Sequence, residues 1–189
     1  DLQMKTTMFL PLLLLLFPAF LQGHCDDETC SPNIYTVLSE LDAKVNKLEN
    51  QLQVHQVAFS ASLLVSGEET IGPYNDFVTL VYKNVVTNVG NAYNPNTGYF
   101  TAPVKGAYHF EFYIAVQGSR VTAAVLVKNG SRTFGAYENI GSGLGSASNG
   151  ITLVLEVGDV VGVHLWENQV IYDSHEHLST FSGRLLFTM

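Results

Sequence analysis

Apolar residues between positions 34 and 52 follow a heptad pattern. They are separated alternately by four and three residues, which is the spacing of the a and d positions of a coiled coil. Because the stripe is narrow, it favours a seam between chains over an amphipathic helix packed on its own domain. We therefore expect residues 34–55 to form a short coiled-coil stem. The pattern allows either a two-stranded or a three-stranded coiled coil. Its seam residues are Ile34, Leu38, Leu41, Val45, Leu48 and Leu52.

From residue 56 onward the helical period disappears, and apolar residues alternate with polar ones in short runs bounded by turn residues. Asn129-Gly130 between two such runs is a hairpin signal. We expect residues 56–189 to form an all-β head, a two-sheet sandwich or jelly roll of about eight to ten strands. In the last run Leu185, Leu186 and Phe187 are consecutive, which predicts burial on both faces, in a central strand or at a subunit interface.

The N-terminal pattern is that of a secretory leader. A run of fourteen mostly apolar residues, 8–21, follows Lys5 and precedes Gln22-Gly23. The run is short for a spanning helix and contains Pro11 and Pro18. We expect residues 1–23 to be a signal peptide with three upstream residues before Met4, and the product to be secreted and extracellular, with no membrane anchor.

Two cysteines lie just after this leader, in an acidic tail of residues 24–33. Secretion favours disulfides over metal or redox chemistry, so a metal site formed by His24, Cys25 and Cys30 is disfavoured. Cys25 and Cys30 either close a small loop or link separate chains. We favour interchain bonds, because closing so short a loop in an unpacked tail gains little.

The composition excludes one class of partner. The chain of 189 residues has 17 acidic and 9 basic side chains, a formal net charge of −8, and 47% apolar residues. This apolar content is ample for a packed core. Its basic residues are scattered singly, so there is no cationic footprint for nucleic acid.

A set of fixed spacings in the predicted head resembles the signature of the C1q globular domain. The frame is Asn-x4-Tyr-x6-Phe-x5-Gly-x-Tyr-x-Phe-x-Phe, and Phe181 and Gly183 lie in a closing motif. Where the family usually begins this signature with Phe, this chain has Tyr82, whose hydroxyl needs a partner. The resemblance covers nearly all of residues 56–189, and it implies a ten-stranded jelly roll of the C1q/tumour necrosis factor type that assembles as a homotrimer. The signature positions are Asn88, Tyr93, Phe100, Gly106, Tyr108, Phe110 and Phe112.

The resemblance also suggests a function. The glycines form no collagen-like repeat, so the layout looks more like cerebellin-type and other short-stalk C1q-like proteins. It implies an oligomeric binding protein whose trimeric heads recognise a receptor, or a microbial or carbohydrate surface as in complement-like innate immunity. Covalent linkage could join trimers into larger oligomers. The alternative is a cerebellin-like or tumour necrosis factor-like signalling ligand.

An enzyme is the competing class, and the sequence offers it little. His175-Glu176-His177 with Asp173 nearby lacks a third fixed zinc ligand, so a polar loop is the simpler interpretation and a metal-dependent hydrolase is disfavoured. Residues 141–145 are rich in glycine but precede neither a Gly-Lys-Ser/Thr motif nor a helix, and we expect a flexible loop. No nucleophile elbow occurs, and both cysteines lie in the tail.

Four other residues are candidates for sites. Asn129-Gly-Ser131 is a sequon, so Asn129 either carries a glycan, making the chain a glycoprotein, or forms an unmodified hairpin turn. Calcium is bound by some proteins with this signature, and Asp159 and Asp173 are the candidate ligands here; Gly158-Asp159 also suits a metal-free turn. No other cofactor is expected. Trp166 is interpreted as a core or interface residue rather than a sugar-stacking platform.

Overall fold

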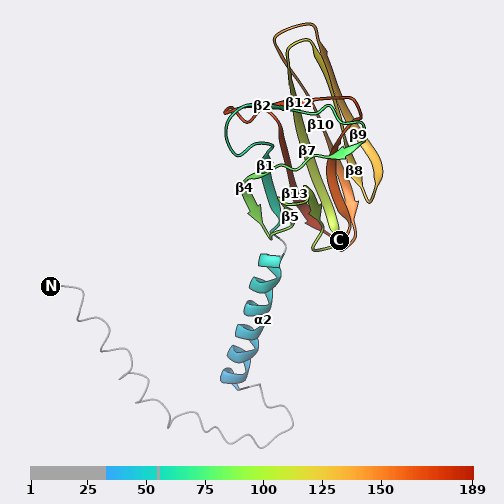
Figure 1. Ribbon diagram of the computed structural model, residues 1–189. Coiled ribbons are helices and arrows are strands. Elements are labelled where there is room, and N and C mark those ends of the chain that lie inside the picture. The colour runs from blue at the N-terminus through green and yellow to red at the C-terminus, as the bar shows by residue number, and fades with distance from the viewer. Residues whose placement is uncertain (1–32, 55) are drawn as a thin grey trace, which may run out of the picture. The chain divides into compact units, whose positions relative to one another are not determined.

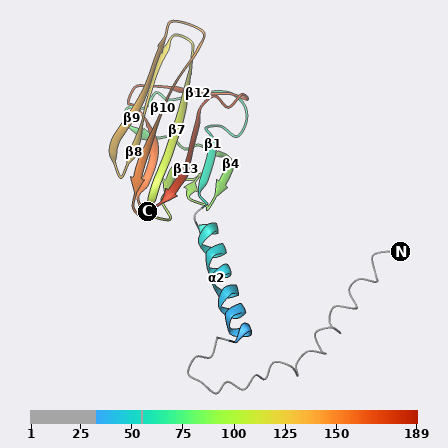
Figure 2. The same cartoon turned by 180° about the vertical axis from the view of Figure 1, so that it is seen from behind.

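The structure is a computed structural model that describes residues 33–54 and 56–189. Its head is a sandwich of two antiparallel sheets (Figure 1 and, from behind, Figure 2). The first sheet has the order β2(Glu69–Ile71), β12(Ile171–Asp173), β7(Gly106–Gln117), β13(Thr180–Thr188), β1(Ala58–Ser62), β4(Asn84–Val89), with β10(Leu144–Leu155) also paired to β7. The second has the order β5(Tyr93–Asn94), β6(Tyr99–Thr101), β11(Val160–Leu165), β8(Arg120–Lys128), β9(Ser131–Ile140), with β3(Val78–Thr79) paired to β11.

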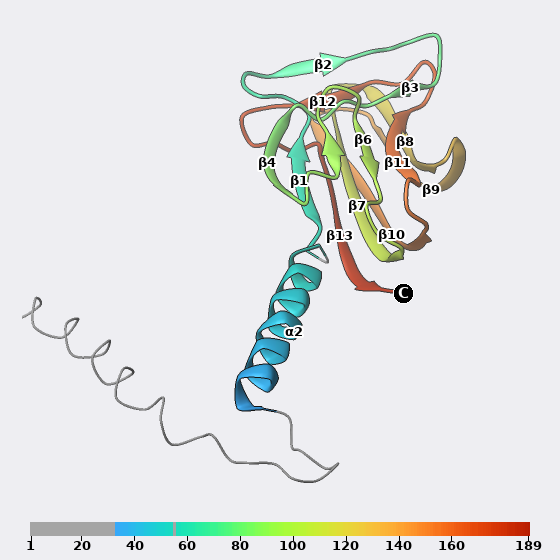
Figure 3. The same ribbon diagram turned by 90° about the horizontal axis from the view of Figure 1, so that it is seen from below.

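The prediction of an all-β jelly roll is confirmed. Within the described residues the head has thirteen strands rather than the ten that the resemblance implies, because five segments of two or three residues (β2, β3, β5, β6 and β12) add to the eight longer ones. In Figure 3 strands β1, β4 and β13 lie on one side of the head and β8, β9 and β11 on the other. The sandwich therefore presents one outer face on each sheet.

Aromatic side chains from both sheets fill the space between them. Phe59 stacks on Tyr93 with ring centroids 4.7 Å apart and meets Phe181 edge-on at 4.8 Å. Phe100 of the second sheet packs edge-on against Phe110 of the first at 5.1 Å. Burying each such side chain stabilises the fold by about 1.5–3 kcal/mol. Because side chains alternate along a strand, β7 directs its phenylalanines into this core and His109 and Glu111 to the outside.

Two predicted connections take different forms. Asn129 and Gly130 both have positive φ, +48° and +80°, as the predicted tight hairpin between β8 and β9 requires. Residues 141–143 instead cross from β9 in one sheet to β10 in the other, and Gly143 accepts the Gly118 N–H at 2.8 Å. The predicted loop is thus shorter than expected, because Leu144 and Gly145 already belong to β10.

The last strand partly contradicts its prediction. β13 is central, between β7 and β1, as expected for an apolar run. Burial on both faces is nevertheless wrong for the single chain, since Leu186 and Phe187 are exposed, Phe187 by 60%. A register shift between Leu185 and Phe187 interrupts the alternation at this point. This end of the strand therefore carries apolar side chains on the surface.

The predicted stem contains one helix, α2(Ile34–Val54). Asn33 precedes it, and its side-chain oxygen accepts the Tyr35 N–H at 3.1 Å, which is an N-cap. None of the helical structure in the described chain has the length and apolar character needed to cross a bilayer. Residues 1–32, with the expected leader and both cysteines, lie outside the described residues, as does the side chain of Leu52.

Candidate functional site

The outer face of the seven-stranded sheet is the first candidate surface. On this face β7 lies between β10 and β13, and residues directly opposite one another form cross-strand rows. His109 lies between Thr152 and Arg184, and Glu111 lies between Gly150 and Ser182. We use "outer face" for these rows together with Val154, Ala107 and Phe187 at one end and Tyr113 at the other.

Three ionisable side chains meet in the middle of the outer face. The Glu111 carboxylate lies 3.3 Å from the Arg184 guanidinium and 3.5 Å from His109 Nε2. His109 Nδ1 lies 3.0 Å from the Thr152 hydroxyl. Sequence reasoning missed this cluster. The alternation of β7 directs His109 and Glu111 outward, but the position of Arg184 opposite His109 and diagonal to Glu111 depends on the β7–β13 register.

Small side chains surround these charges, and apolar ones lie at the ends. Gly150 and Ser182 flank Glu111, and Ser148 lies opposite Tyr113, so the backbone can approach another protein closely. Val154, Phe187 and Tyr113 are exposed. The outer face thus combines small side chains with exposed apolar ones, which is suited to packing against a protein.

Helix α2 is the second candidate surface. Five of the six predicted seam residues have described side chains, and all are exposed; Leu41 and Leu48 are 55% and 58% accessible. The predicted seam is therefore unpaired in the single chain. Its association with other chains stays a prediction. The five exposed residues are Ile34, Leu38, Leu41, Val45 and Leu48.

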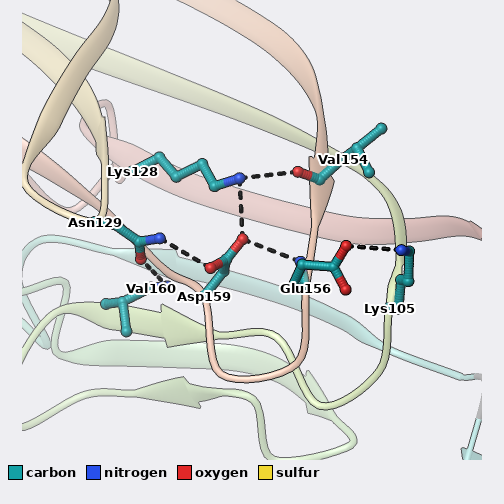
Figure 4. Close-up of polar contacts among 7 residues, drawn as sticks. All are labelled: Lys105, Lys128, Asn129, Val154, Glu156, Asp159 and Val160. Atoms are coloured by element: carbon teal, nitrogen blue, oxygen red, sulfur yellow. Dashed lines mark hydrogen bonds and ion pairs between the residues drawn. The ribbon is translucent and has the colours of Figure 1, made fainter.

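Asp159, a calcium candidate, is held by donors from the chain itself (Figure 4). Asn129 Nδ2 donates to its carboxylate at 2.8 Å, the Glu156 N–H at 3.0 Å and Lys128 Nζ at 2.9 Å. These interactions, led by the Asn129 hydrogen bond, lower the pKa of Asp159 to about 2. Asn129 also accepts the Val160 N–H at 2.8 Å. The carboxylate therefore ties the β10–β11 turn to the β8–β9 hairpin, while glycosylation of the exposed Asn129 stays a prediction.

Asp173, the second calcium candidate, is fully buried and also has internal partners. It accepts the Leu64 N–H at 3.0 Å and the Ser179 N–H at 3.2 Å. Among residues 33–54 and 56–189 no three His, Cys, Asp or Glu side chains are grouped as a metal site would need. Calcium binding at Asp159 or Asp173 stays a prediction.

The histidine loop has a structural explanation. His177 has a positive φ of +53°, and its N–H donates to the Ser174 carbonyl, which closes a turn. Its Nδ1 lies 2.9 Å from the Ser62 hydroxyl, so this ring is directed to β1. His175 is exposed. His177 therefore serves a polar turn before β13, and His175 lies on the surface.

The family-signature residues pack and close turns rather than form a site. The Asn88 side chain accepts the Tyr93 N–H and donates to the Tyr93 carbonyl, at 3.2 and 2.8 Å. A Cβ on Gly106 would lie 2.6 Å from the Phe187 carbonyl oxygen. Tyr108, Phe110, Phe112, Phe100 and Phe181 are fully buried. The expected partner of the Tyr82 hydroxyl is absent among the described residues: this oxygen is buried and makes no hydrogen bond.

Trp166 is not a core residue. It is 42% exposed, and the Arg132 guanidinium lies 5.3 Å from its ring centroid. Because Trp166 follows Leu165, whose side chain is in the core, alternation directs the indole to the outer face of the second sheet. The core interpretation of Trp166 is therefore wrong, and the ring lies on the surface.

Comparison with known proteins places this architecture in a family. Residues 58–186 match the C1q domain. Complement C1q tumor necrosis factor-related protein 3 of Mus musculus is 34% identical over 134 residues, which are 70% of this chain and 52% of that protein. The Homo sapiens protein of the same name gives the same identity and coverage. The chain therefore belongs to the C1q domain family, and it spans about half the length of these relatives.

Solved structures support the same fold. The globular domain of zebrafish complement 1qA protein superimposes with a TM-score of 0.55 at 19% identity, covering 71% of this chain and 99% of that one. Eiger TNF from S. frugiperda superimposes with a TM-score of 0.57 at 13% identity, covering 71% of this chain and 94% of that one. Murine APRIL at pH 5.0 superimposes with a TM-score of 0.55 at 11% identity, covering 69% of this chain and 99% of that one. The C1q/tumour necrosis factor jelly roll is confirmed.

Proposed function

We propose that this protein is a secreted, non-enzymatic binding protein that assembles as a homotrimer and presents its heads to an extracellular receptor or a microbial or carbohydrate surface. The observation that carries the proposal is the exposed seam of α2. Five apolar residues at a and d spacing are accessible in the single chain. Fully burying such a side chain contributes about 1.5–3 kcal/mol, which supports association of the stems.

The outer face supports assembly of the heads as well. Exposed Tyr113 and Phe187 lie at opposite ends of a face with small side chains between them. A second copy packed there would bury these anchors and desolvate the Glu111–Arg184 pair, which favours one register over others. Stem and head thus each supply an association surface, and Cys25 and Cys30 would link chains covalently.

A signalling ligand is the second candidate, and one observation favours it. The curated relatives are complement C1q tumor necrosis factor-related proteins, and structures of tumour necrosis factor type share the fold. Both candidates need the same assembly. They differ in whether binding strength depends on several heads engaging one surface at once.

Valence distinguishes the two candidates. An array of glycans and cell-surface proteins, probed with the intact oligomer, first supplies a target. Dissociation from a dense layer of that target is then measured for the full chain, the Cys25→Ser/Cys30→Ser variant and a variant lacking residues 24–55. Multivalent recognition predicts an apparent affinity about 10²–10⁴ higher for the full chain than for the deletion, with the cysteine variant between them. Equal rates for all three would reject it and favour the single-site ligand.

A further inference from the structure

Two exposed aromatic side chains flank a small residue on the outer face of the six-stranded sheet. The Trp166 N–H donates to the Ala123 carbonyl at 3.0 Å, and Ala123 lies opposite Tyr137 in the β8–β9 register. The three residues therefore form one row across three neighbouring chain segments. At about 4.8 Å per step, the backbones of Trp166 and Tyr137 are about 10 Å apart, with only a methyl group between them.

This row is the floor and walls of a pocket of about 350 Å³, a size at the lower end of ligand sites. We call it the aromatic slot. Ala123 is buried, whereas Tyr137 is 63% exposed and Trp166 is accessible. Its lining is Tyr137, Trp166 and Gln169 together with four small residues, Ala123, Ala124, Gly135 and Ala136.

Neighbouring contacts fix the indole before any ligand binds. The Arg132 guanidinium lies over both the Trp166 ring and the Phe77 ring, 5.3 and 4.4 Å from their centroids. Phe77 in turn packs on His164 at 4.9 Å, and His164 Nε2 lies 3.1 Å from the Tyr99 hydroxyl. Burial, and then the nearby Arg132 charge, lower the pKa of His164, which favours the neutral ring beside that cation. A wall held in this way loses little conformational freedom on binding.

The dimensions and chemistry of the slot select its occupant. A ring stacked between two aromatic side chains lies about 4.5–7 Å from each ring centroid, and a backbone separation of about 10 Å between Trp166 and Tyr137 is compatible with one flat ring between them. A guanidinium would be repelled by Arg132. A sugar ring would need several hydrogen-bonding partners, whereas the lining is four small residues, two aromatic rings and one amide. We propose that the aromatic slot binds an aromatic side chain of a polypeptide partner.

A second hollow favours a polypeptide over a free aromatic molecule. It measures about 430 Å³ and shares Gln169 with the slot. Residues on either side of a bound aromatic side chain would lie in this hollow, next to Arg120 and Val121. Tyrosine and tryptophan anchors of this kind dominate many protein interfaces.

This inference rests on the proposed binding function, since it names the kind of partner that each head recognises. Its test uses a monovalent probe, whose binding does not depend on how many heads are joined. If the slot binds the probe but the full chain and its variants dissociate at equal rates, multivalent recognition alone is rejected. If the dissociation rates differ as expected but the probe does not bind, the slot alone is rejected.

Trp166 is the one tryptophan of the chain, so its fluorescence reports directly on the slot. The full-length protein is titrated with N-acetyl-phenylalaninamide, N-acetyl-leucinamide, N-acetyl-argininamide and a methyl mannoside. We expect a saturable change with the phenylalanine probe and none with the other three over the same range. A pentapeptide, Ala-Ala-Phe-Ala-Ala, should bind more tightly than the single amide because it also occupies the second hollow.

Variants separate the slot from the rest of the surface. Ala123→Leu fills the floor and Tyr137→Ser removes a wall, and each should weaken the phenylalanine probe at least tenfold. Tyr74→Ser is the matched control, since Tyr74 is 40% exposed at a different hollow. The Tyr74→Ser variant should bind the phenylalanine probe as tightly as the unmodified protein does. Thermal unfolding checks that each variant folds, with Ala123→Val replacing Ala123→Leu if that variant does not.

Four results would overturn the proposal. Three concern the slot itself: the absence of a saturable response to the phenylalanine probe, unchanged binding by folded Ala123→Leu, and tighter binding of the mannoside, which would make the slot a carbohydrate site. The fourth is equal affinity for the pentapeptide and the single amide, which would reject the polypeptide partner.

Discussion

The Tyr93 hydroxyl satisfies both backbone groups of Tyr82: it donates to the Tyr82 carbonyl at 2.9 Å and accepts the Tyr82 N–H at 3.1 Å. Both contacts are buried, so Tyr93→Phe leaves one donor and one acceptor unpaired. At about 1–3 kcal/mol per unpaired group, we expect the free energy of unfolding to fall by about 2–4 kcal/mol. Urea denaturation at fixed protein concentration measures the change. A loss below about 0.5 kcal/mol would show that water replaces the hydroxyl.

Tyr82→Phe is expected to change the free energy of unfolding in the opposite direction. The Tyr82 hydroxyl is buried without a described partner, and this burial raises its pKa well above the usual value. Removing the oxygen therefore removes a desolvation cost and breaks no hydrogen bond. The free energy of unfolding should rise by about 1 kcal/mol in the same urea experiment. A decrease would reveal an unseen partner for this hydroxyl.

Gly183 has no room for a side chain. A Cβ there would lie 2.5 Å from Phe110 and 2.7 Å from Phe59, two rings of the core. Gly183→Ala should lower the free energy of unfolding by about 1–3 kcal/mol through overpacking. Gly141→Ala is the control, because its Cβ would meet nothing within 4 Å. Equal stabilities of the two variants would contradict this account of the signature glycine.

Asp159 should make stability depend on pH in acid. Its pKa of about 2 lies below the ordinary value of 3.8, so its stabilising contribution is present above pH 3.8 and is lost as pH falls toward 2. In Asp159→Asn this part of the pH dependence should be absent. Thermal melts between pH 2 and 5 test the difference. Parallel curves for the two proteins would show that the carboxylate is not held this way in solution.

The stem should associate through its seam. Leu41→Asp with Leu48→Asp would bury unpaired charges between helices, so a peptide of residues 31–55 carrying both changes should be monomeric. Ser39→Asp with Asn46→Asp adds the same charge off the seam and should leave association intact. Multi-angle light scattering gives the mass of each peptide. An unmodified peptide that is monomeric at every reachable concentration would refute the stem, although the heads could still trimerise.

The tail cysteines should link chains. Non-reducing electrophoresis of the secreted protein should show covalent dimers or larger species that collapse on reduction, and Cys25→Ser with Cys30→Ser should abolish them. Head folding should be unaffected, since neither cysteine belongs to the head. Migration as a monomer without reductant would instead support the small internal loop.

Most of the fold could be predicted from local patterns. Alternation along residues 107–114 predicts β7, and Asn129-Gly130 predicts the hairpin that follows β8, because both depend on neighbours in the chain. The short strands β3 and β5 gave no such signal. Two residues carry no period, and these strands form only because β11 and β6 pair with them.

The candidate surfaces depended on long-range register. The heptad seam of α2 is visible in the sequence because a helix brings residues three and four apart to one side. The Glu111–Arg184 contact joins positions 73 residues apart, and it exists because β13 pairs with β7 in one register. A shift of one residue would direct Arg184 to the other face of the sheet.

The amino-acid sequence by itself determined the class of the head, its family and the helical stem, since these depend on periodicity and on spacings within the chain. Tertiary structure alone decided that Asp159 and Asp173 serve turns, that the Tyr82 hydroxyl lacks a partner, and that Trp166 and Tyr137 flank one slot. The physical reason is that sheet pairing brings distant residues together, and whether a polar group or a ring is exposed depends on what the opposing strand places against it.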